Sequence, residues 1–180
     1  MPDLLLPQVD LQSDQVPVSS LGDLLPPLLT SRLAREGVSH LFPVQRQVIP
    51  RLLSLASLTP RLPPPDICVS APTGSGKTLA FVLPILASLQ GRLVPRVRAL
   101  AVLPTQDLAL QVYKVFSTYC EGSVLKVKLL TGGESVVGEE GLVRRGVGGV
   151  HQLWDILVVT PGRLTHTLRE VPALDLSHLR

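Results

Sequence analysis

The chain has 180 residues, a length typical of one domain that buries its own core without disulfides or structural metals. Its 17 basic and 14 acidic residues give a net charge of +3, which favours a polyanionic partner weakly and fits an ordinary solvated surface equally well. The first residues lack a secretory pattern, no apolar run is long enough for a membrane span, and the two distant cysteines show no metal spacing, so we expect a soluble intracellular protein.

The charge is unevenly distributed along the chain. The first 30 residues contain four acidic residues, Asp3, Asp10, Asp14 and Asp23, and no lysine or arginine. Prolines interrupt this stretch and few of its residues recur at helical spacing. We therefore predict that residues 1–23 form a flexible acidic leader and that residues 24–180 form the domain.

The domain begins with two predicted helices. Apolar residues recur at helical spacing from Leu24 to Arg35, and Gly37 follows as a C-cap. A second helical pattern covers Val44–Leu58, and the proline-rich stretch from Pro60 to Pro65 stops it.

Strands and helices then alternate, which predicts βαβ units, a parallel sheet and helices on both of its faces. The first predicted strand is Asp66–Ser70, and it places Cys68 in the core. A helix to about Gln90 follows a glycine-rich loop. A weak helical pattern covers 135–145, within a glycine-rich stretch that is hard to assign. The other predicted strands are Val97–Leu103, Val127–Leu130 and Asp155–Val159, and the other helices are Thr105–Cys120 and Pro161–Arg169.

The glycine-rich loop between the first strand and its helix has the composition of a phosphate cradle. Glycines at 74 and 76 allow the backbone to fold around an anion, so that the amides point inward at the helix N-terminus. Lys77 then supplies a point charge for the β- and γ-phosphates, and the Thr78 hydroxyl is placed to ligate Mg²⁺. A plain turn is the alternative. The predicted ATP-binding residues of the loop are Ala71, Pro72, Thr73, Gly74, Ser75, Gly76, Lys77 and Thr78, and we assign catalytic roles to Lys77 and Thr78.

This loop resembles motif I of the DEAD-box RNA helicases, in which alanine replaces the usual first glycine. Pro104-Thr105-Gln106-Asp107-Leu108-Ala109-Leu110-Gln111 is similar to motif Ia, Thr131-Gly132-Gly133 to the GG element, and Thr160-Pro161-Gly162-Arg163 to motif Ib. Upstream, Gly37 and Leu41-Phe42-Pro43-Val44-Gln45 resemble the Q motif, at about residues 37–45. The resemblance covers residues 24–180 and is greatest to the nucleolar branch that acts in large ribosomal subunit assembly.

The resemblance assigns Gln45 the reading of adenine. Its side-chain amide both donates and accepts, so it can pair bidentately with an adenine edge, which gives roughly 1–3 kcal/mol of discrimination on the scale of base readout. A solvated helix glutamine is the alternative. The family usually carries an aromatic residue after the glycine, and Val38 at that position predicts weaker stacking.

The resemblance also implies contacts with the RNA backbone. Thr105 and Thr160 each follow a strand and precede a helix, so they are expected at the carboxyl edge of the sheet, where ligands bind. Helix capping is the alternative role of both hydroxyls, and it is compatible with phosphate binding. Gln106 and Asp107 replace the family's Arg-Glu, which removes one phosphate contact. The predicted RNA-binding residues are Pro104, Thr105, Gln106, Gly132, Gly133, Thr160, Pro161, Gly162 and Arg163.

The implied activity is that of an ATP-dependent RNA helicase, with ATP and Mg²⁺ as cofactors, RNA and pre-ribosomal particles as partners, and the nucleus and nucleolus as location. The Asp-Glu-Ala-Asp motif is absent from the sequence, so we interpret the chain as the ATP-binding front of a RecA-like P-loop domain, truncated before motif II, with little ATPase activity of its own. A non-catalytic isoform that binds nucleotide or RNA is one alternative. A different P-loop NTPase is another, and Gln45 together with Thr160–Arg163 argues against it.

Overall fold

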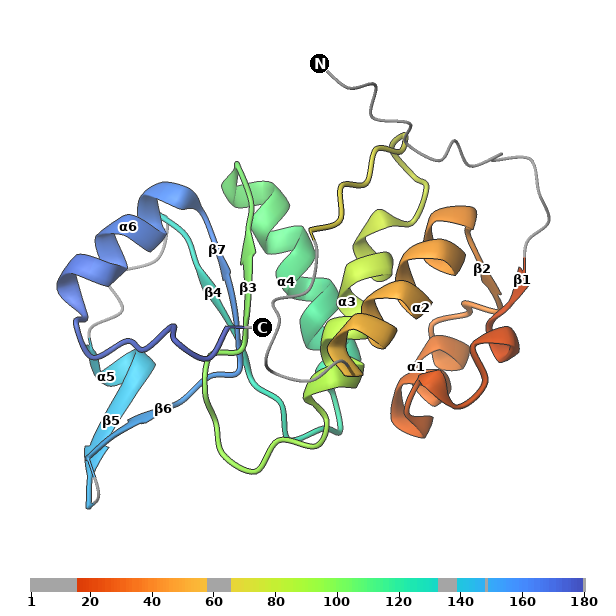
Figure 1. Ribbon diagram of the computed structural model, residues 1–180. Coiled ribbons are helices and arrows are strands. Elements are labelled where there is room, and N and C mark those ends of the chain that lie inside the picture. Colours follow the sequence, from red (N-terminus) through yellow and green to blue (C-terminus); the bar gives the residue numbers. More distant parts are fainter. Residues whose placement is uncertain (1–15, 58–65, 133–138, 148, 180) are drawn as a thin grey trace. The chain divides into compact units, whose positions relative to one another are not determined.

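The computed structural model describes residues 16–57, 66–132, 139–147 and 149–179. The chain divides into two compact units, residues 1–81 and 82–180, and the boundary falls within one helix (Figure 1). No helix within the described ranges has both the length and the apolar character that crossing a membrane requires.

The described residues of the first unit before the glycine-rich loop form two short paired strands, a 3₁₀ segment and two helices. Strand β1 (Val16–Pro17) pairs antiparallel with β2 (His40–Leu41), and a 3₁₀ segment, η1 (Val18–Leu24), follows β1. Helix α1 (Pro27–Arg35) and helix α2 (Pro43–Ser57) confirm the two predicted helices. Helix α1 starts later than expected because Pro26 is its N-cap, with a ψ of +147°, and Pro27 is its first residue.

Gly37 ends α1 as predicted. It has a φ of +73°, and its N–H donates to the Ala34 carbonyl while the Val38 N–H donates to the Leu33 carbonyl. These two bonds define a Schellman motif, in which a left-handed residue satisfies carbonyls at the helix end. The motif sets the direction in which the chain enters β2.

The prediction of a leader through residue 23 is corrected at its end. Residues 1–15 lie outside the described residues, but residues 16–23 are not a flexible leader, because β1 pairs with β2 and Leu21 is buried. Val16 and Pro17 form a strand only because β2, which begins 23 positions after Pro17, pairs with them. Local composition does not reveal such a distant partner.

The predicted strand Asp66–Ser70 does not form, and this is a second correction. These residues have no regular secondary structure, Ile67 is only half-buried, and Cys68 is exposed rather than in the core. A β-strand is stabilised by its neighbours, and no described strand pairs with this segment. This apolar run therefore has no strand partner and remains accessible immediately before the glycine-rich loop.

Among its described residues, the second unit contains a parallel sheet of three strands in the order β3-β7-β4. These strands, β3 (Ala99–Val102), β4 (Val127–Leu130) and β7 (Ile156–Val159), confirm three predicted strands, and Ala99, Ile156 and Val127 share one register row. Helix α3 (Lys77–Leu89) spans the boundary between the units. Helices α4 (Gln106–Cys120) and α6 (Pro161–Glu170) follow β3 and β7, as predicted.

The central strand β7 is buried along its whole length, with no residue more than 1 % exposed. Leu157 and Val159 belong to a core cluster with Leu130, Val143 and Leu174, while α4 contacts β4 and β7. Because consecutive strand residues point to opposite faces, both faces of β7 are covered. This is the α/β arrangement that the strand–helix alternation predicted.

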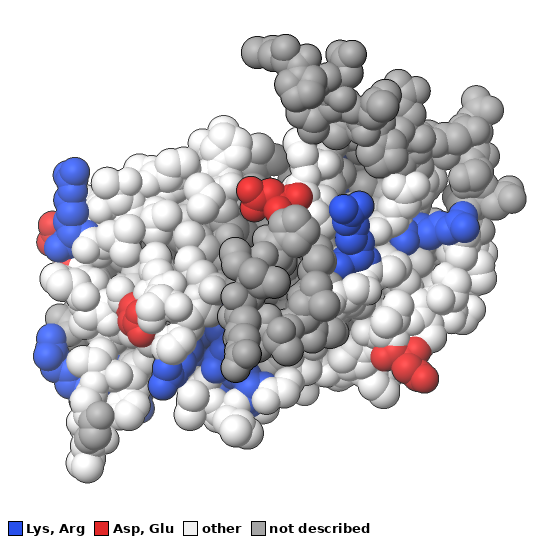
Figure 2. Space-filling model, in the orientation of Figure 1, with Lys and Arg blue, Asp and Glu red and all other residues white. Residues whose placement is uncertain are grey.

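The glycine-rich stretch before β7 forms an antiparallel hairpin that the sequence did not predict. Of the expected weak helix over 135–145, residues 135–138 lie outside the described residues and Glu139–Leu142 form one turn, α5. Residues 143–145 are not helical, because β5 (Val143–Gly146) pairs with β6 (Gly149–Gln152). The helix stops there because Val143 enters the core and its strand pairs with β6. In Figure 1 the hairpin projects from the end of the sheet at which the parallel strands begin, and Figure 2 shows Lys and Arg side chains along that lower edge of the unit.

Candidate functional site

The glycine-rich loop, in the first unit, forms a tight turn at the start of α3. Gly74 and Gly76 have φ values of +77° and +82°, and the Ser75 N–H donates to the Pro72 carbonyl at 3.4 Å. Only glycine adopts such angles without strain. No described non-glycine residue has a positive φ, so the methyl group of Ala71, which replaces the usual glycine, fits its backbone conformation.

Lys77 points its ammonium group back into this loop. Its Nζ lies 2.6 Å from the Ala71 carbonyl oxygen, 2.5 Å from that of Pro72 and 3.5 Å from Ser75 Oγ. The ammonium group of Lys77 therefore lies inside the loop, hydrogen-bonded to loop oxygens. The oxygens of a bound phosphate would replace these loop oxygens as its acceptors. Charge-assisted bonds to phosphate are stronger than bonds to neutral carbonyls, which favours that exchange.

Gln45 connects the Q-motif-like segment to the loop. Its side chain is 1 % exposed, its Nε2 donates to the Gly76 carbonyl at 3.0 Å, and its Oε1 accepts the Phe42 N–H at 2.9 Å. A Cβ on Gly76 would lie 2.4 Å from Gln45 Nε2 and 2.8 Å from the Phe42 ring. The Gly76 carbonyl also accepts the Ala80 N–H, so one oxygen serves both the helix and Gln45.

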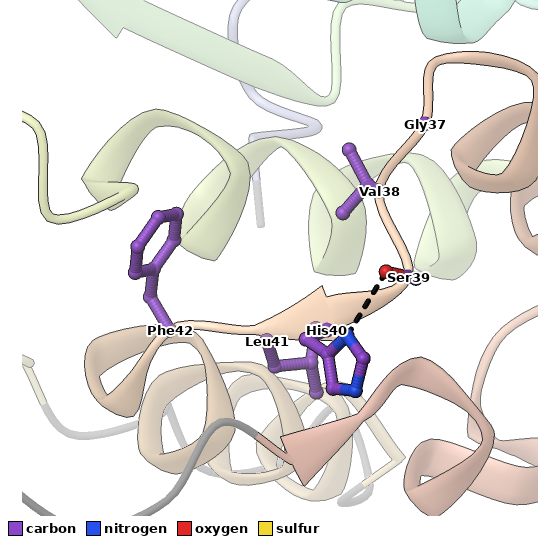
Figure 3. A pocket seen from close by; sticks show the side chains of 6 residues that line it. All are labelled: Gly37, Val38, Ser39, His40, Leu41 and Phe42. Carbon is purple, nitrogen blue, oxygen red and sulfur yellow. Dashed lines mark hydrogen bonds between the residues drawn. The ribbon is translucent and has the colours of Figure 1, made fainter.

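A shallow hollow of about 250 Å³ lies beside this contact and is lined by residues 37–42. In Figure 3, Val38 and Phe42 stand on one side of the segment, whereas His40 and Leu41 point to the other. Phe42 is 44 % exposed and lies close to Gly76. Phe42 belongs to the Q-motif-like stretch, but no role was predicted for it. Its position three residues before Gln45 is the sequence feature that could have indicated a place beside the site.

The loop provides few protein ligands for a metal ion. Thr78 lies in the first turn of α3 and is half-buried, which suits a hydroxyl that ligates one position of Mg²⁺. Within the described part of the chain, no group of three or more His, Cys, Asp or Glu side chains is arranged to hold a metal. Mg²⁺ usually retains several waters and binds through one or two protein groups plus phosphate oxygens, so Thr78 fits an ion that arrives with a nucleotide.

The predicted RNA-binding residues lie in the second unit, and the sheet brings them together. Val102, Val159 and Leu130 occupy one register row, and Thr105, Thr160 and Gly132 follow within three residues of it. The Leu103 N–H donates to the Val159 carbonyl and the Thr160 N–H to the Leu130 carbonyl. Three of the predicted segments therefore share the carboxyl edge of the sheet, as expected from its parallel topology.

Other residues of this edge have defined positions. Gln106 packs over Gly132, since a Cβ there would lie 3.0 Å from Gln106 Nε2. Pro161 is the first residue of α6, a position whose N–H has no acceptor within the helix, so the lack of an N–H in proline costs no hydrogen bond. Pro104 and Gly162 are exposed, Arg163 is half-buried in the first turn of α6, and Gly133 lies outside the described residues.

The two threonines at this edge differ in their hydrogen bonds. Thr105 Oγ1 accepts the Leu108 N–H at 3.3 Å and so caps α4, whereas the Thr160 side chain makes no capping bond to α6. We expect Thr105→Ala to lower the free energy of unfolding by about 1 kcal/mol and Thr160→Ala to change it by only a few tenths. Urea denaturation followed by Trp154 fluorescence measures both effects in this unit, and equal losses in the two variants would contradict the assignment.

A buried ion pair lies at the opposite end of the sheet and was not predicted from sequence. Arg92 Nε lies 2.8 Å from Asp155 Oδ1, Asp155 Oδ2 accepts the Lys126 N–H at 2.9 Å, and the two side chains are 9 % and 0 % exposed. Burial raises the pKa of the Asp155 carboxyl, although the Lys126 amide and Arg92 act in the lowering direction. Burial, assisted by the negative charge of Asp155, raises the pKa of Cys120 to about 12.

Comparisons with known proteins show which family the chain resembles. The pattern of the DEAD/DEAH box helicase family matches residues 42–180. The chain is 47 % identical to "ATP-dependent RNA helicase DDX51" of Danio rerio over 99 % of its own length, and 40 % identical to "ATP-dependent RNA helicase dbp6" of Schizosaccharomyces pombe over 84 %. A DEAD box protein from Methanococcus jannaschii has a similar fold, with a TM-score of 0.69 at 23 % identity over 93 % of this chain and 40 % of that one.

The chain spans only about a quarter of these curated relatives, 28 % of the Danio rerio protein and 25 % of the Schizosaccharomyces pombe protein.

Proposed function

The chain belongs to the DEAD/DEAH box helicase family, and from this premise we propose that it is the ATP-binding front part of an ATP-dependent RNA helicase. The contact between Gln45 and the Gly76 carbonyl carries the proposal. A phosphate loop alone indicates a nucleotide. The buried side-chain amide of Gln45 is hydrogen-bonded to that loop beside an open hollow, and it adds a group that can distinguish one base from another.

In the proposed mechanism the loop holds the phosphates of ATP. The amides of Gly74 to Thr78 face the anion, Lys77 transfers its bonds from loop carbonyls to phosphate oxygens, and the Thr78 hydroxyl ligates Mg²⁺. Bound Mg²⁺ supplies charge neutralisation between the phosphate oxygens. Gln45 retains one unused amide hydrogen and one lone pair for adenine, because each end of its amide makes one bond in the structure. Phe42 offers the stacking surface that Val38 does not provide.

The carboxyl edge of the parallel sheet is the proposed RNA site. Thr160 has a hydroxyl that does not cap its helix, and the first amides of α4 and α6 can bind phosphate oxygens. The described part of this edge contains no aromatic side chain for stacking bases, which favours contacts to the backbone without sequence preference. In the whole protein, ATP binding and hydrolysis would be coupled to unwinding or remodelling of the bound RNA.

The relatives' names also support a cellular role. Similarity to the helicases named DDX51 and dbp6 leads us to propose a function in ribosome biogenesis, with pre-ribosomal particles as partners and the nucleus and nucleolus as location. A truncated isoform that binds nucleotide or RNA without hydrolysis is the alternative function. Sequencing the transcript beyond the codon for Arg180 distinguishes the two, since a following Asp-Glu-Ala-Asp motif supports the helicase and an immediate stop codon supports the isoform.

The proposal predicts that Lys77→Ala lowers the affinity for ATP by at least about tenfold, because one charge-assisted phosphate bond contributes roughly 1.5–3 kcal/mol. Titration of the 180-residue chain with a fluorescent ATP analogue measures the change. Lys114→Ala, on α4, is the matched control and should leave the affinity unaltered. Equal affinity of the Lys77 variant and the unsubstituted chain would contradict the phosphate-loop assignment.

A further inference from the structure

The second unit carries most of its positive charge at the end of the sheet opposite the predicted RNA residues. We call this end the foot, defined by the β5–β6 hairpin and by residues 92–98, 121–128, 153–155 and 171–178. Arg98 directly precedes β3 and Lys126 directly precedes β4. In Figure 2, Lys and Arg side chains gather along this lower edge.

The hairpin is fixed to the foot by its base. Leu142 and Val143 are buried in the core, the Leu153 N–H donates to the Leu142 carbonyl at 3.1 Å, and Gln152 Nε2 donates to the Ala173 carbonyl at 3.0 Å. Trp154 Nε1 donates to the Gly141 carbonyl at 2.7 Å. These bonds hold the hairpin in one orientation, so that binding a partner does not require the base to be ordered first.

The outer part of the hairpin presents basic side chains on both of its faces. Arg144 lies opposite His151 and Arg145 lies opposite Val150, and all four residues are exposed. Because neighbouring strand residues alternate between faces, one arginine points to each side. Gly146 and Gly149 face each other near the tip, next to the exposed Val147.

Basic side chains outnumber acidic ones among the described residues of the foot. Arg92 and Asp155 neutralise each other in their buried pair. Among the remaining described side chains at the foot, six are basic and two are acidic, whereas the first turns of α4 and α6 at the carboxyl edge contribute one of each, Asp107 and Arg163. The basic residues of the foot are Arg96, Arg98, Lys126, Lys128, Arg144 and Arg145, and the acidic ones are Glu121 and Asp175.

We propose that the foot, with the β5–β6 hairpin at its centre, is a second RNA-binding surface that holds backbone phosphates of RNA extending beyond the carboxyl edge. The inference rests on the proposed function as a helicase. Guanidinium groups suit phosphate oxygens, and the aromatic side chain at the foot, Trp154, is half-buried beneath Lys128 rather than open to a base. A strand of four residues spans only about 13 Å, so an RNA somewhat longer than one edge reaches both ends of the sheet.

The test compares two lengths of RNA on the full 180-residue chain. Arg144→Ser/Arg145→Ser is expected to weaken binding of an oligouridine of about 30 nucleotides by at least about threefold and to reduce its salt slope by about 1.4, at 0.7 for each phosphate contact. Binding of an oligouridine of about 8 nucleotides, which fits one edge, should be unchanged. Arg35→Ser/Arg51→Ser, in the first unit, loses the same charge and is the matched control.

A second variant tests the same surface with the hairpin unchanged, so that the test remains decisive if the double substitution misfolds the hairpin. Lys126→Gln leaves the backbone bond to Asp155 intact and is expected to reduce the salt slope for the long RNA by about 0.7. Circular dichroism of each variant confirms that it is folded.

The outcomes separate this inference from the proposed function. If the unsubstituted chain binds neither RNA, the RNA-binding function itself fails. If Arg163→Ser weakens binding of both RNAs while the hairpin and Lys126 variants weaken neither, only the second surface is overturned. Exposed Leu93, Val124 and Val147 also lie at the foot, so an acidic, leucine-rich peptide is the competing probe. Loss of peptide binding in the hairpin variant with unchanged RNA binding would assign the foot to a protein partner instead.

Discussion

Gly76→Ala is expected to reduce ATP affinity at least about tenfold and to destabilise the first unit. The new Cβ would lie 2.4 Å from Gln45 Nε2 and 2.8 Å from the Phe42 ring, and the residue has a φ of +82°. The left-handed backbone alone costs roughly 1–2 kcal/mol for alanine. The clash adds to this, because the buried Gln45 amide must leave the Gly76 carbonyl and lose its partner. Fluorescent-nucleotide titration and thermal unfolding measure the two effects.

Gly74→Ala is the matched control for this prediction. Gly74 has nearly the same φ, +77°, but open space surrounds the position of its Cβ. The control therefore retains the backbone strain and lacks the clash with Gln45, so its effects should be clearly smaller. Equal effects of the two substitutions would show that only the backbone angle matters and that Gln45 is not coupled to the loop.

Asp155→Ala is expected to lower the free energy of unfolding of the second unit by about 3–5 kcal/mol. It leaves the Arg92 guanidinium buried without its counter-charge and the Lys126 N–H without an acceptor. Asp155→Asn should cost less, because it keeps an acceptor for Lys126 and removes the charge that burial penalises. Urea denaturation followed by Trp154, the single tryptophan of the chain and a neighbour of Asp155, measures both variants.

The control is Asp175→Ala, at an exposed carboxylate that accepts the Ser177 N–H, which should cost about 1 kcal/mol or less. The pH dependence provides an independent check. Since burial raises the folded-state pKa of Asp155 above its unfolded value, its contribution to stability is fully present below the unfolded pKa, near 4, and is lost as the pH rises through the folded pKa. The Asn variant should lack this dependence. A loss of stability on acidification that disappears in the Asn variant would reverse the assigned sign.

Local sequence signals were sufficient to predict the elements that their own residues stabilise and those that follow from the alternation of strands and helices. The helix at Gln106–Cys120 carries its own cap at Thr105, Gly37 ends α1 by its own backbone angle, and the apolar strands β3, β4 and β7 follow from the strand–helix pattern. The parallel topology then placed Thr105, Gly132 and Thr160 at one edge, because the carboxyl ends of parallel strands coincide.

Elements that depend on distant partners were not predictable in this way. Asp66–Ser70 has the composition of a strand, yet composition does not supply the neighbour with which a strand must pair. The β5–β6 hairpin is pinned by bonds to Ala173 and Leu142 that no local pattern shows. The proximity of Phe42 to Gly76 and the bond between Gln45 and Gly76 likewise involve residues 31 or more positions apart.

The two cysteines differ in a way that makes the chain easy to label. Cys68 is exposed beside the phosphate loop, whereas Cys120 is buried and its pKa of about 12 keeps it almost wholly in the unreactive thiol form at neutral pH. A maleimide fluorophore added to the unmodified protein should therefore attach at a single site, three residues before Ala71. The chain thus provides its own attachment point for a dye that follows nucleotide binding in real time, without any engineered cysteine.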